Sequence, residues 1–290
     1  MTLSYEADNI NRTGNEMNFI EKLLNATRKN TSLVCVGLDP NPELMPDKVD
    51  IFEFNREIIN ATAELVCAYK LNFAFYEVLG AEGFDILKRT VDCIPDEIPV
   101  IADAKRGDIG NTAQAYARAI FANLNFDAAT VNPYLGFDSI EPFIQYRDRG
   151  VFILCRTSNP GSADFQSLSY KTGQQSCPLF ELVAAKASQW NRYGNIGLVV
   201  GATYPQELKL IRQSHPDMPL LIPGIGAQGG DLEKSISFGA DASGEKAIIN
   251  SSRQIIYASR GEDFAQAARK ATTELRDRIN HYRSNIKRPQ

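Results

Sequence analysis

Cysteine and histidine are scarce in this 290-residue sequence, which has five cysteines and two histidines. No two cysteines are spaced as CxxC, so the sequence gives no sign of a zinc cluster or a redox pair. An odd number of scattered thiols is typical of a reducing compartment rather than a disulfide framework. The cysteines are Cys35, Cys67, Cys93, Cys155 and Cys177.

Excess positive charge and long apolar runs are also missing. The formal net charge is -4, so no general attraction to nucleic acid is expected, and an anionic substrate would need a few placed cations. No stretch approaches the roughly 18 apolar residues of a membrane span, and the polar, acidic N-terminus is unlike a signal peptide. We therefore expect a cytoplasmic protein without a membrane or nucleic-acid partner.

The sequence does contain eight short apolar runs, spaced along its whole length. Most lack the alternation of a half-exposed strand, which favours parallel strands buried on both faces. Stretches of helical periodicity lie between them, at 51–64, 80–93, 111–123, 178–193 and 263–282, and a further helix at 16–28 precedes the first strand. The predicted strands are 33–38, 65–71, 100–103, 128–132, 151–156, 196–201, 219–223 and 247–250.

Strict alternation of strand and helix, repeated eight times, favours one closed (β/α)8 TIM barrel over residues 1–290. An open Rossmann-like sheet is the alternative. We expect the helix at 16–28 to plug the bottom of the barrel, and residues 1–15 and 284–290 to be flexible termini. The Ser-, Gly- and Gln-rich segment 157–177 is predicted to be a long loop on the active-site face, and its distal half is equally compatible with a tolerated surface insertion.

Polar residues follow the predicted strands at the end where barrel enzymes place their active sites. A set of alternating acids and bases converging there is unusual, because buried charges are tolerated only when paired. The residues at these positions are Asp39, Lys70, Asn72, Asp103, Lys105, Asn132, Ser158, Asn159, Gln228 and Arg253.

The segment from Asp103 to Asp108 is the most informative of these. In an extended chain Asp103 and Lys105 point to the same side, where each can fix the charge of the other. Asn111 or Thr112 can then cap the following helix. Taken alone, the Asp-x-Lys pair is better explained by a salt-bridged strand end with a helix cap than by a catalytic site.

In the segment DAKRGDI at 103–109 the sequence resembles the DxKxxDI motif of orotidine 5'-monophosphate decarboxylases, in the branch with longer chains (type 2). Further matching motifs follow in family order across nearly the whole chain. They are GLDP at 37–40, YKLNFAFYE at 69–77, VNPYLG at 131–136, TSNPG at 157–161, PGIGAQGGD at 223–231 and NSSR at 250–253.

The resemblance implies a role for each matching residue. Lys70, Asp103, Lys105 and Asp108 would form the catalytic charged array, and Asp39 and Lys70 would bind the ribose hydroxyls. Ser158 would contact the pyrimidine, while Gln228 and Arg253, with Pro223 and Ser252 beside them, would hold the phosphate. Asp108, Ile109 and Thr112 would reach into the neighbouring subunit's site, which implies a homodimer with shared sites.

The expected chemistry is decarboxylation of orotidine 5'-monophosphate (OMP) to uridine 5'-monophosphate (UMP), the last step of UMP biosynthesis, without cofactor or metal. The ammonium of Lys105 would stabilise the C6 carbanion and then protonate it. Asp103 would disfavour the substrate carboxylate in the ground state. Remote phosphate contacts would lower the barrier by closing the loop 223–232.

Three alternatives stay open from the sequence. The GxGxxG pattern at 224–229, with Glu245 beyond it, could belong to a dinucleotide site, although it falls in the seventh unit instead of the first. A related Mg²⁺-dependent sugar-phosphate enzyme also carries DxKxxD, but has an acidic ligand where Lys70 stands. A nucleotide-binding protein without catalysis is the third alternative.

Overall fold

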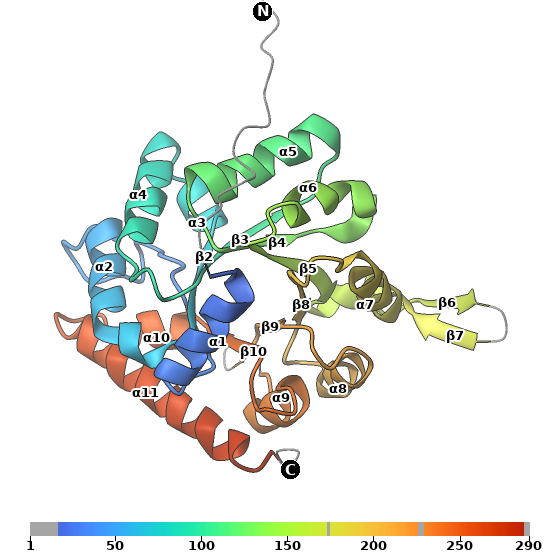
Figure 1. The fold of residues 1–290 in the computed structure, drawn as a ribbon. Coiled ribbons are helices and arrows are strands. Elements are labelled where there is room, and N and C mark those ends of the chain that lie inside the picture. The colour runs from blue at the N-terminus through green and yellow to red at the C-terminus, as the bar shows by residue number, and fades with distance from the viewer. Residues whose placement is uncertain (1–16, 173–174, 226–228, 287–290) are drawn as a thin grey trace, which may run out of the picture.

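The computed structural model describes residues 17–172, 175–225 and 229–286, and its centre is a closed barrel of eight parallel strands (Figure 1). Neighbouring strands follow the order β1-β10-β9-β8-β5-β4-β3-β2. All eight predicted strands are confirmed, and closure excludes the open Rossmann-like sheet. The strands are β1 (Val34–Gly37), β2 (Ala68–Asn72), β3 (Val100–Arg106), β4 (Ala128–Val131), β5 (Gly150–Arg156), β8 (Ile196–Val200), β9 (Leu220–Ile222) and β10 (Ala247–Ser251).

Helices surround the barrel, and local sequence fixes several of their ends. Asp50 and Asp231 accept hydrogen bonds from backbone N–H groups at the starts of α2 and α9, so these helices begin at capping residues. The larger helices are α2 (Ile51–Thr62), α4 (Ala81–Asp92), α5 (Gly110–Arg118), α7 (Leu179–Trp190), α8 (Pro205–Ser214), α9 (Leu232–Gly239) and α11 (Phe264–Arg283), with short α3 (Ala74–Glu77), α6 (Glu141–Ile144) and α10 (Arg253–Ile256) beside them.

The predicted cap of α5 is wrong. The helix begins at Gly110, with Ile109 at its N-cap position and no side-chain capping bond. Gly110 has φ +55°, a left-handed conformation that glycine adopts without strain, so the chain turns into the helix before Asn111 and Thr112 are reached. Both residues consequently lie inside the first turn of the helix.

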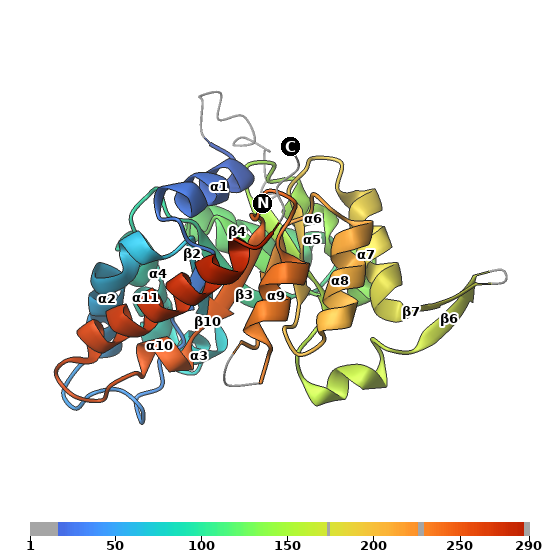
Figure 2. The same cartoon turned by 90° about the horizontal axis from the view of Figure 1, so that it is seen from below.

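Helix α1 (Phe19–Lys29) closes one end of the barrel, as predicted (Figure 2). Asn18 caps it and exchanges hydrogen bonds with Glu21, which fixes its start. The Phe19 ring meets the Phe152 ring edge-on at 5.6 Å between centroids. Phe19 and Leu23 pack with inward-facing residues of all eight strands, so the apolar barrel interior is sealed at this end.

The segment after β5 contains regular structure that the sequence analysis did not predict. The short helix η5 (Pro160–Asp164) is followed by an antiparallel hairpin of β6 (Ser169–Thr172) and β7 (Gln175–Pro178). The hairpin projects away from the barrel beside α7 (Figures 1 and 2). The predicted loop thus divides into a proximal part near the barrel mouth and a distal hairpin.

Within the described part of the chain, no helix combines the length and apolarity that crossing a membrane requires. Residues 1–16 and 287–290, which include most of the predicted flexible termini, lie outside the described residues.

Candidate active site

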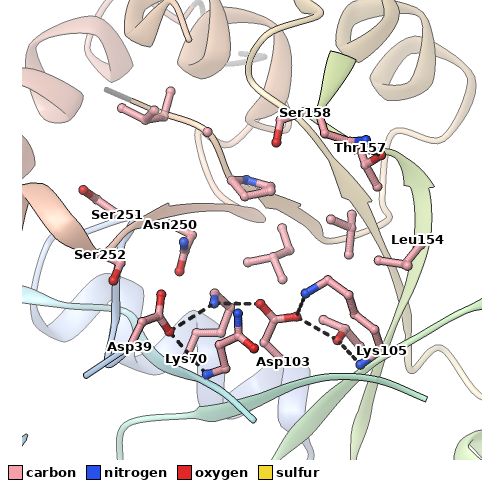
Figure 3. Close-up of a pocket in the computed structure, with 18 of the residues that line it drawn as sticks. Asp39, Lys70, Asp103, Lys105, Leu154, Thr157, Ser158, Asn250, Ser251 and Ser252 are labelled. Carbon is pink, nitrogen blue, oxygen red and sulfur yellow. Dashed lines mark hydrogen bonds and ion pairs between the residues drawn. The ribbon is translucent and has the colours of Figure 1, made fainter. Parts of the chain in front are cut away.

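A cavity of about 520 Å³ lies at the carboxyl ends of the barrel strands, opposite the end that α1 closes. Most of the predicted site residues meet there: Asp39, Lys70, Asp103, Lys105, Ser158, Pro223, Ser252 and Arg253 all line it. Figure 3 shows the charged residues in a row along one wall, with Thr157 and Ser158 on the opposite wall. Asn72 and Asn159, which the strand-end pattern also predicted at this mouth, line the cavity as well. Four further lining residues were not predicted from the sequence: Thr130, Thr157, Gln166 and Asn250.

The charged row alternates in sign. Lys70 Nζ lies 2.9 Å from Asp103 Oδ2 and 3.9 Å from Asp39 Oδ1, and Lys105 Nζ lies 2.5 Å from Asp103 Oδ1. Lys70 is buried at the end of β2, whereas about half of the Lys105 side chain is exposed to the cavity. One ammonium is therefore fixed between two carboxylates, and the other can reach a bound molecule.

The pKa values of the buried pair are shifted by opposing effects. Burial alone would raise the pKa of Asp103, but the ammonium groups of Lys70 and Lys105 outweigh it and hold that pKa well below its usual range. Burial would lower the pKa of Lys70, but Asp103 and Asp39 outweigh it and raise that pKa. The carboxylate and the buried ammonium are both charged at neutral pH.

An irregularity in β3 brings Asp103 and Lys105 together, and it differs from the extended chain that was predicted. The pairing register with β4 shifts between Ala102 and Arg106, and Lys105 has φ +47°. A left-handed conformation is uncommon for a residue with a side chain and is found at functional sites. Both side chains therefore point into the cavity, as the sequence predicted, but they do so through a bulge that strand alternation did not foresee.

A buried arginine supports the wall that faces the charged row, on the side away from the cavity. Arg156, at the end of β5, is 2% exposed, forms an ion pair with Glu207, and donates a hydrogen bond to Ser162. Its guanidinium lies over the Tyr204 ring at 3.6 Å. The proximal part of the 157–177 segment is thereby attached to the barrel.

Gln166 and Gly201 place Thr157 and Ser158 on this wall. The Gln166 Oε1 accepts from the Thr157 N–H at 2.8 Å, and its Nε2 donates to Thr157 Oγ1 at 2.9 Å. A Cβ on Gly201 would lie 2.7 Å from the Ser158 backbone, so only glycine allows this approach. Gln166 gave no signal in the sequence because it lies in a segment without periodicity.

At the third side of the cavity, Pro223 and the segment Ser252–Arg253 follow β9 and β10. Ser252 Oγ is buried and, among the described residues, has no hydrogen-bond partner. Such an orphaned hydroxyl is available to a ligand. Ile225 and Gly230 form a β-bridge that closes the base of the loop after β9, while Gln228 lies outside the described residues.

Asp108, Ile109 and Thr112 are absent from the described lining of this cavity. Asp108 Oδ1 accepts a hydrogen bond from the Ile109 N–H at 2.8 Å, and Ile109 is 52% exposed. These three residues therefore do not belong to the described wall of the chain's own cavity.

The position of Glu245 argues against a dinucleotide-binding site. Its carboxylate forms two 2.9 Å hydrogen bonds with Arg28 of α1, at the sealed end of the barrel. It therefore cannot bind a ribose at the cavity, where the fingerprint would require it. Over the described ranges, no group of three or more His, Cys, Asp or Glu side chains is arranged to hold a metal ion.

Residues 32–271 match the Orotidine 5'-phosphate decarboxylase / HUMPS family. The chain belongs to this family. An orotidine 5'-phosphate decarboxylase of Dehalococcoides mccartyi (strain CBDB1) is 60% identical over 270 residues, covering 93% of this chain and 100% of the relative. That of Herpetosiphon aurantiacus is 51% identical over 272 residues, covering 91% and 99%.

The fold agrees with solved structures of decarboxylase family members. The structure of Leishmania donovani OMP decarboxylase superposes with a TM-score of 0.81 at 41% identity, and the match covers 92% of this chain and 100% of that one. This decarboxylase-family chain is accordingly an enzyme, and its charged row lies where its fold places an active site.

Proposed function

We propose that the chain converts OMP to UMP without a cofactor or metal ion, and that Lys105 protonates C6. The observation that carries the proposal is the row of Lys70, Asp103 and Lys105 at the mouth of the barrel. Membership of the decarboxylase family supports the substrate, and the names of its relatives support the reaction. UMP biosynthesis would be the corresponding pathway, in the cytoplasm.

The cavity offers a separate group for each part of the nucleotide. Arg253, the orphaned Ser252 hydroxyl and the segment from Pro223 to Gln228 would bind the phosphate, since a guanidinium fork and a free hydroxyl both suit phosphate oxygens. Asp39 and Lys70 would bind the ribose, and Ser158 the pyrimidine. The volume of about 520 Å³ lies within the usual range of small-ligand pockets.

The reaction then needs few steps. The bond between C6 and the carboxylate breaks, CO₂ leaves, and the electron pair stays on C6. The Lys105 ammonium stabilises this charge because it is held in place before the charge develops. It then gives one proton to C6 and regains a proton from water, while Asp103 stays ionised between its two ammonium neighbours.

We also propose a homodimer in which Asp108, Ile109 and Thr112 complete the partner's site. Apolar side chains exposed on the segments after β3 and β4 support an interface there, because such patches mark contact surfaces. The segments adjoin, since the Asn132 N–H donates to the Arg106 carbonyl oxygen at 2.7 Å. The exposed side chains are Ile109, Tyr116, Tyr134 and Leu135.

The proposal is tested by incubating the purified chain with OMP, with and without a chelator of divalent cations. We expect UMP and CO₂ in equal amounts and the same rate in both samples. Loss of activity in the chelator would favour the Mg²⁺-dependent alternative. Tight binding of OMP without turnover would favour a nucleotide-binding protein, and either result would contradict the proposal.

A further inference from the structure

Thr130, in the middle of β4, stands opposite the irregular part of β3. Ala102 pairs with Ala129 and Arg106 pairs with Val131, so the single residue Thr130 faces the three residues 103–105. In a regular parallel ladder one residue would face one. The bulge therefore leaves backbone groups of β3 without their ordinary partners on β4.

The Thr130 hydroxyl takes the place of the missing ladder contact. Its Oγ1 accepts from the Lys105 N–H at 3.0 Å and donates to Asp103 Oδ1 at 3.1 Å. Thr130 is 2% exposed, so water cannot readily replace the hydroxyl. One buried hydroxyl thus connects the backbone of the lysine to the carboxylate of the aspartate.

Both bonds act on geometry that is otherwise unfavourable. Lys105 has φ +47°, a conformation that persists only where its surroundings impose it. Asp103 Oδ1 accepts from Thr130 and from Lys105 Nζ, which leaves Oδ2 for Lys70. Without the hydroxyl, the Lys105 N–H would be left unsatisfied beside a strained backbone, and the carboxylate could rotate.

We propose that Thr130 is a positioning residue of the decarboxylation site, whose hydroxyl holds the β3 bulge so that the Lys105 ammonium meets Asp103 and the substrate carbon. The inference rests on the proposed function, since it concerns the same lysine. Thr130 does not take part in bond making. A valine would fill the same space in the strand, so the function of the residue lies in its oxygen.

The test compares Thr130→Val with Thr130→Ser, which keeps the hydroxyl. We expect the valine variant to lose about 10²-fold in kcat for OMP, the size of effect that misplacing a reacting group by about 1 Å produces. KM and the affinity for UMP should stay near wild type, because the phosphate and ribose groups are untouched. The serine variant should regain most of the lost rate.

Thr272→Val is the matched control, because Thr272 is fully buried and its hydroxyl bonds the Ala268 carbonyl oxygen of α11, far from the cavity. Its kcat should equal that of wild type. Wild-type kcat in Thr130→Val would overturn the inference. So would an equal loss in the valine and serine variants together with weak UMP binding, because that result would indicate general disruption of the strand.

Crystal structures of the two Thr130 variants test the positioning separately from the reaction. We expect the Lys105–Asp103 ion pair to be lost in Thr130→Val and kept in Thr130→Ser. An unchanged ion pair and an unchanged Lys105 backbone in the valine variant would overturn the inference even if the chain decarboxylates OMP. Absence of turnover by the wild type would instead contradict the proposed function. The crystal structures of the two variants would still decide whether Thr130 positions Lys105.

Discussion

At the scale of single residues, the site depends on a buried carboxylate that serves two ammonium groups. Asp103 is attached to Lys70 on one oxygen and to Lys105 on the other. Removal of either ammonium group would leave the buried Asp103 carboxylate with less compensating charge. The three groups therefore keep one another ionised. It does so before a substrate binds, and the Lys105 ammonium is therefore held close to Asp103 in the free enzyme.

The depressed pKa of Asp103 makes the stability of the chain depend on acid. Its folded-state pKa lies below the unfolded value of about 4, so the carboxylate stabilises the fold fully above that value. This contribution is lost as the pH falls from about 4 toward the folded-state pKa. The raised pKa of Lys70 gives the opposite pH dependence, because the stabilisation that its ammonium provides is lost only in strong alkali.

We therefore expect acid to weaken wild type more than the double variant Lys70→Met/Asp103→Asn, which lacks the charged pair. Urea unfolding at several pH values measures the difference in free energy of unfolding between the two proteins. The free energy of unfolding of wild type should fall relative to that of the double variant as the pH drops below about 4. A difference that is the same at every pH would contradict the assignment.

At the scale of elements, the segment after β5 combines a pocket wall and a projecting hairpin. Gln166 bonds Thr157 through both ends of its amide. Gln166→Leu keeps most of the volume and removes these bonds. We expect KM for OMP to rise about tenfold, corresponding to about 1.4 kcal/mol, with a smaller change in kcat.

The control for this variant is Gln213→Leu, on the exposed face of α8. It should leave both kinetic parameters at wild-type values. If Gln166→Leu behaves like Gln213→Leu, the wall is held by Arg156 and η5 without the glutamine amide, and the role given to Gln166 is wrong.

Arg212, at the carboxyl end of α8, stabilises the barrel far from the chemistry. Its buried guanidinium donates to five carbonyl oxygens, those of His215, Pro216, Met218, Gly239 and Lys246. Arg212→Met leaves these acceptors unsatisfied, so we expect a loss of at least about 3 kcal/mol in the free energy of unfolding. Arg260→Met, at an exposed position, should be nearly neutral in the same denaturation measurement.

The elements also show what the sequence could and could not predict. The eight strands were predictable because burial on both faces leaves continuous apolar runs. The β6–β7 hairpin was not, because its residues lack apolar alternation. The bulge at Lys105 and the role of Thr130 were hidden as well, since strand periodicity cannot show a shift in pairing register.

At the scale of the whole molecule, the barrel gathers residues from distant parts of the sequence at one mouth. Polar positions just after the strands predicted Asp39, Lys70, Asp103, Lys105, Ser158 and Arg253 in one cavity, and the structure places them there. The same pattern could not predict Gln166. This residue lies eight positions after Ser158, and the chain folds back so that Gln166 lines the same cavity.

The proposed homodimer makes a prediction of its own. Lys105→Ala and Asp108→Ala should each be nearly inactive, because each lacks one part of every site. Mixed dimers should regain one complete site, with up to about half the wild-type activity per heterodimer. Activity of mixed samples measures this, and failure to recover in dimers that demonstrably exchange subunits would rule out shared sites.

The central claim is that Lys105 protonates C6 as CO₂ leaves OMP. Its most direct test is turnover of OMP in D₂O, followed by NMR of the product and measurement of released CO₂. The account predicts UMP with deuterium at C6 and equimolar CO₂ from wild type, and at least about a 10³-fold lower rate from Lys105→Ala. Unimpaired turnover by Lys105→Ala, or no CO₂ from wild type, would contradict it.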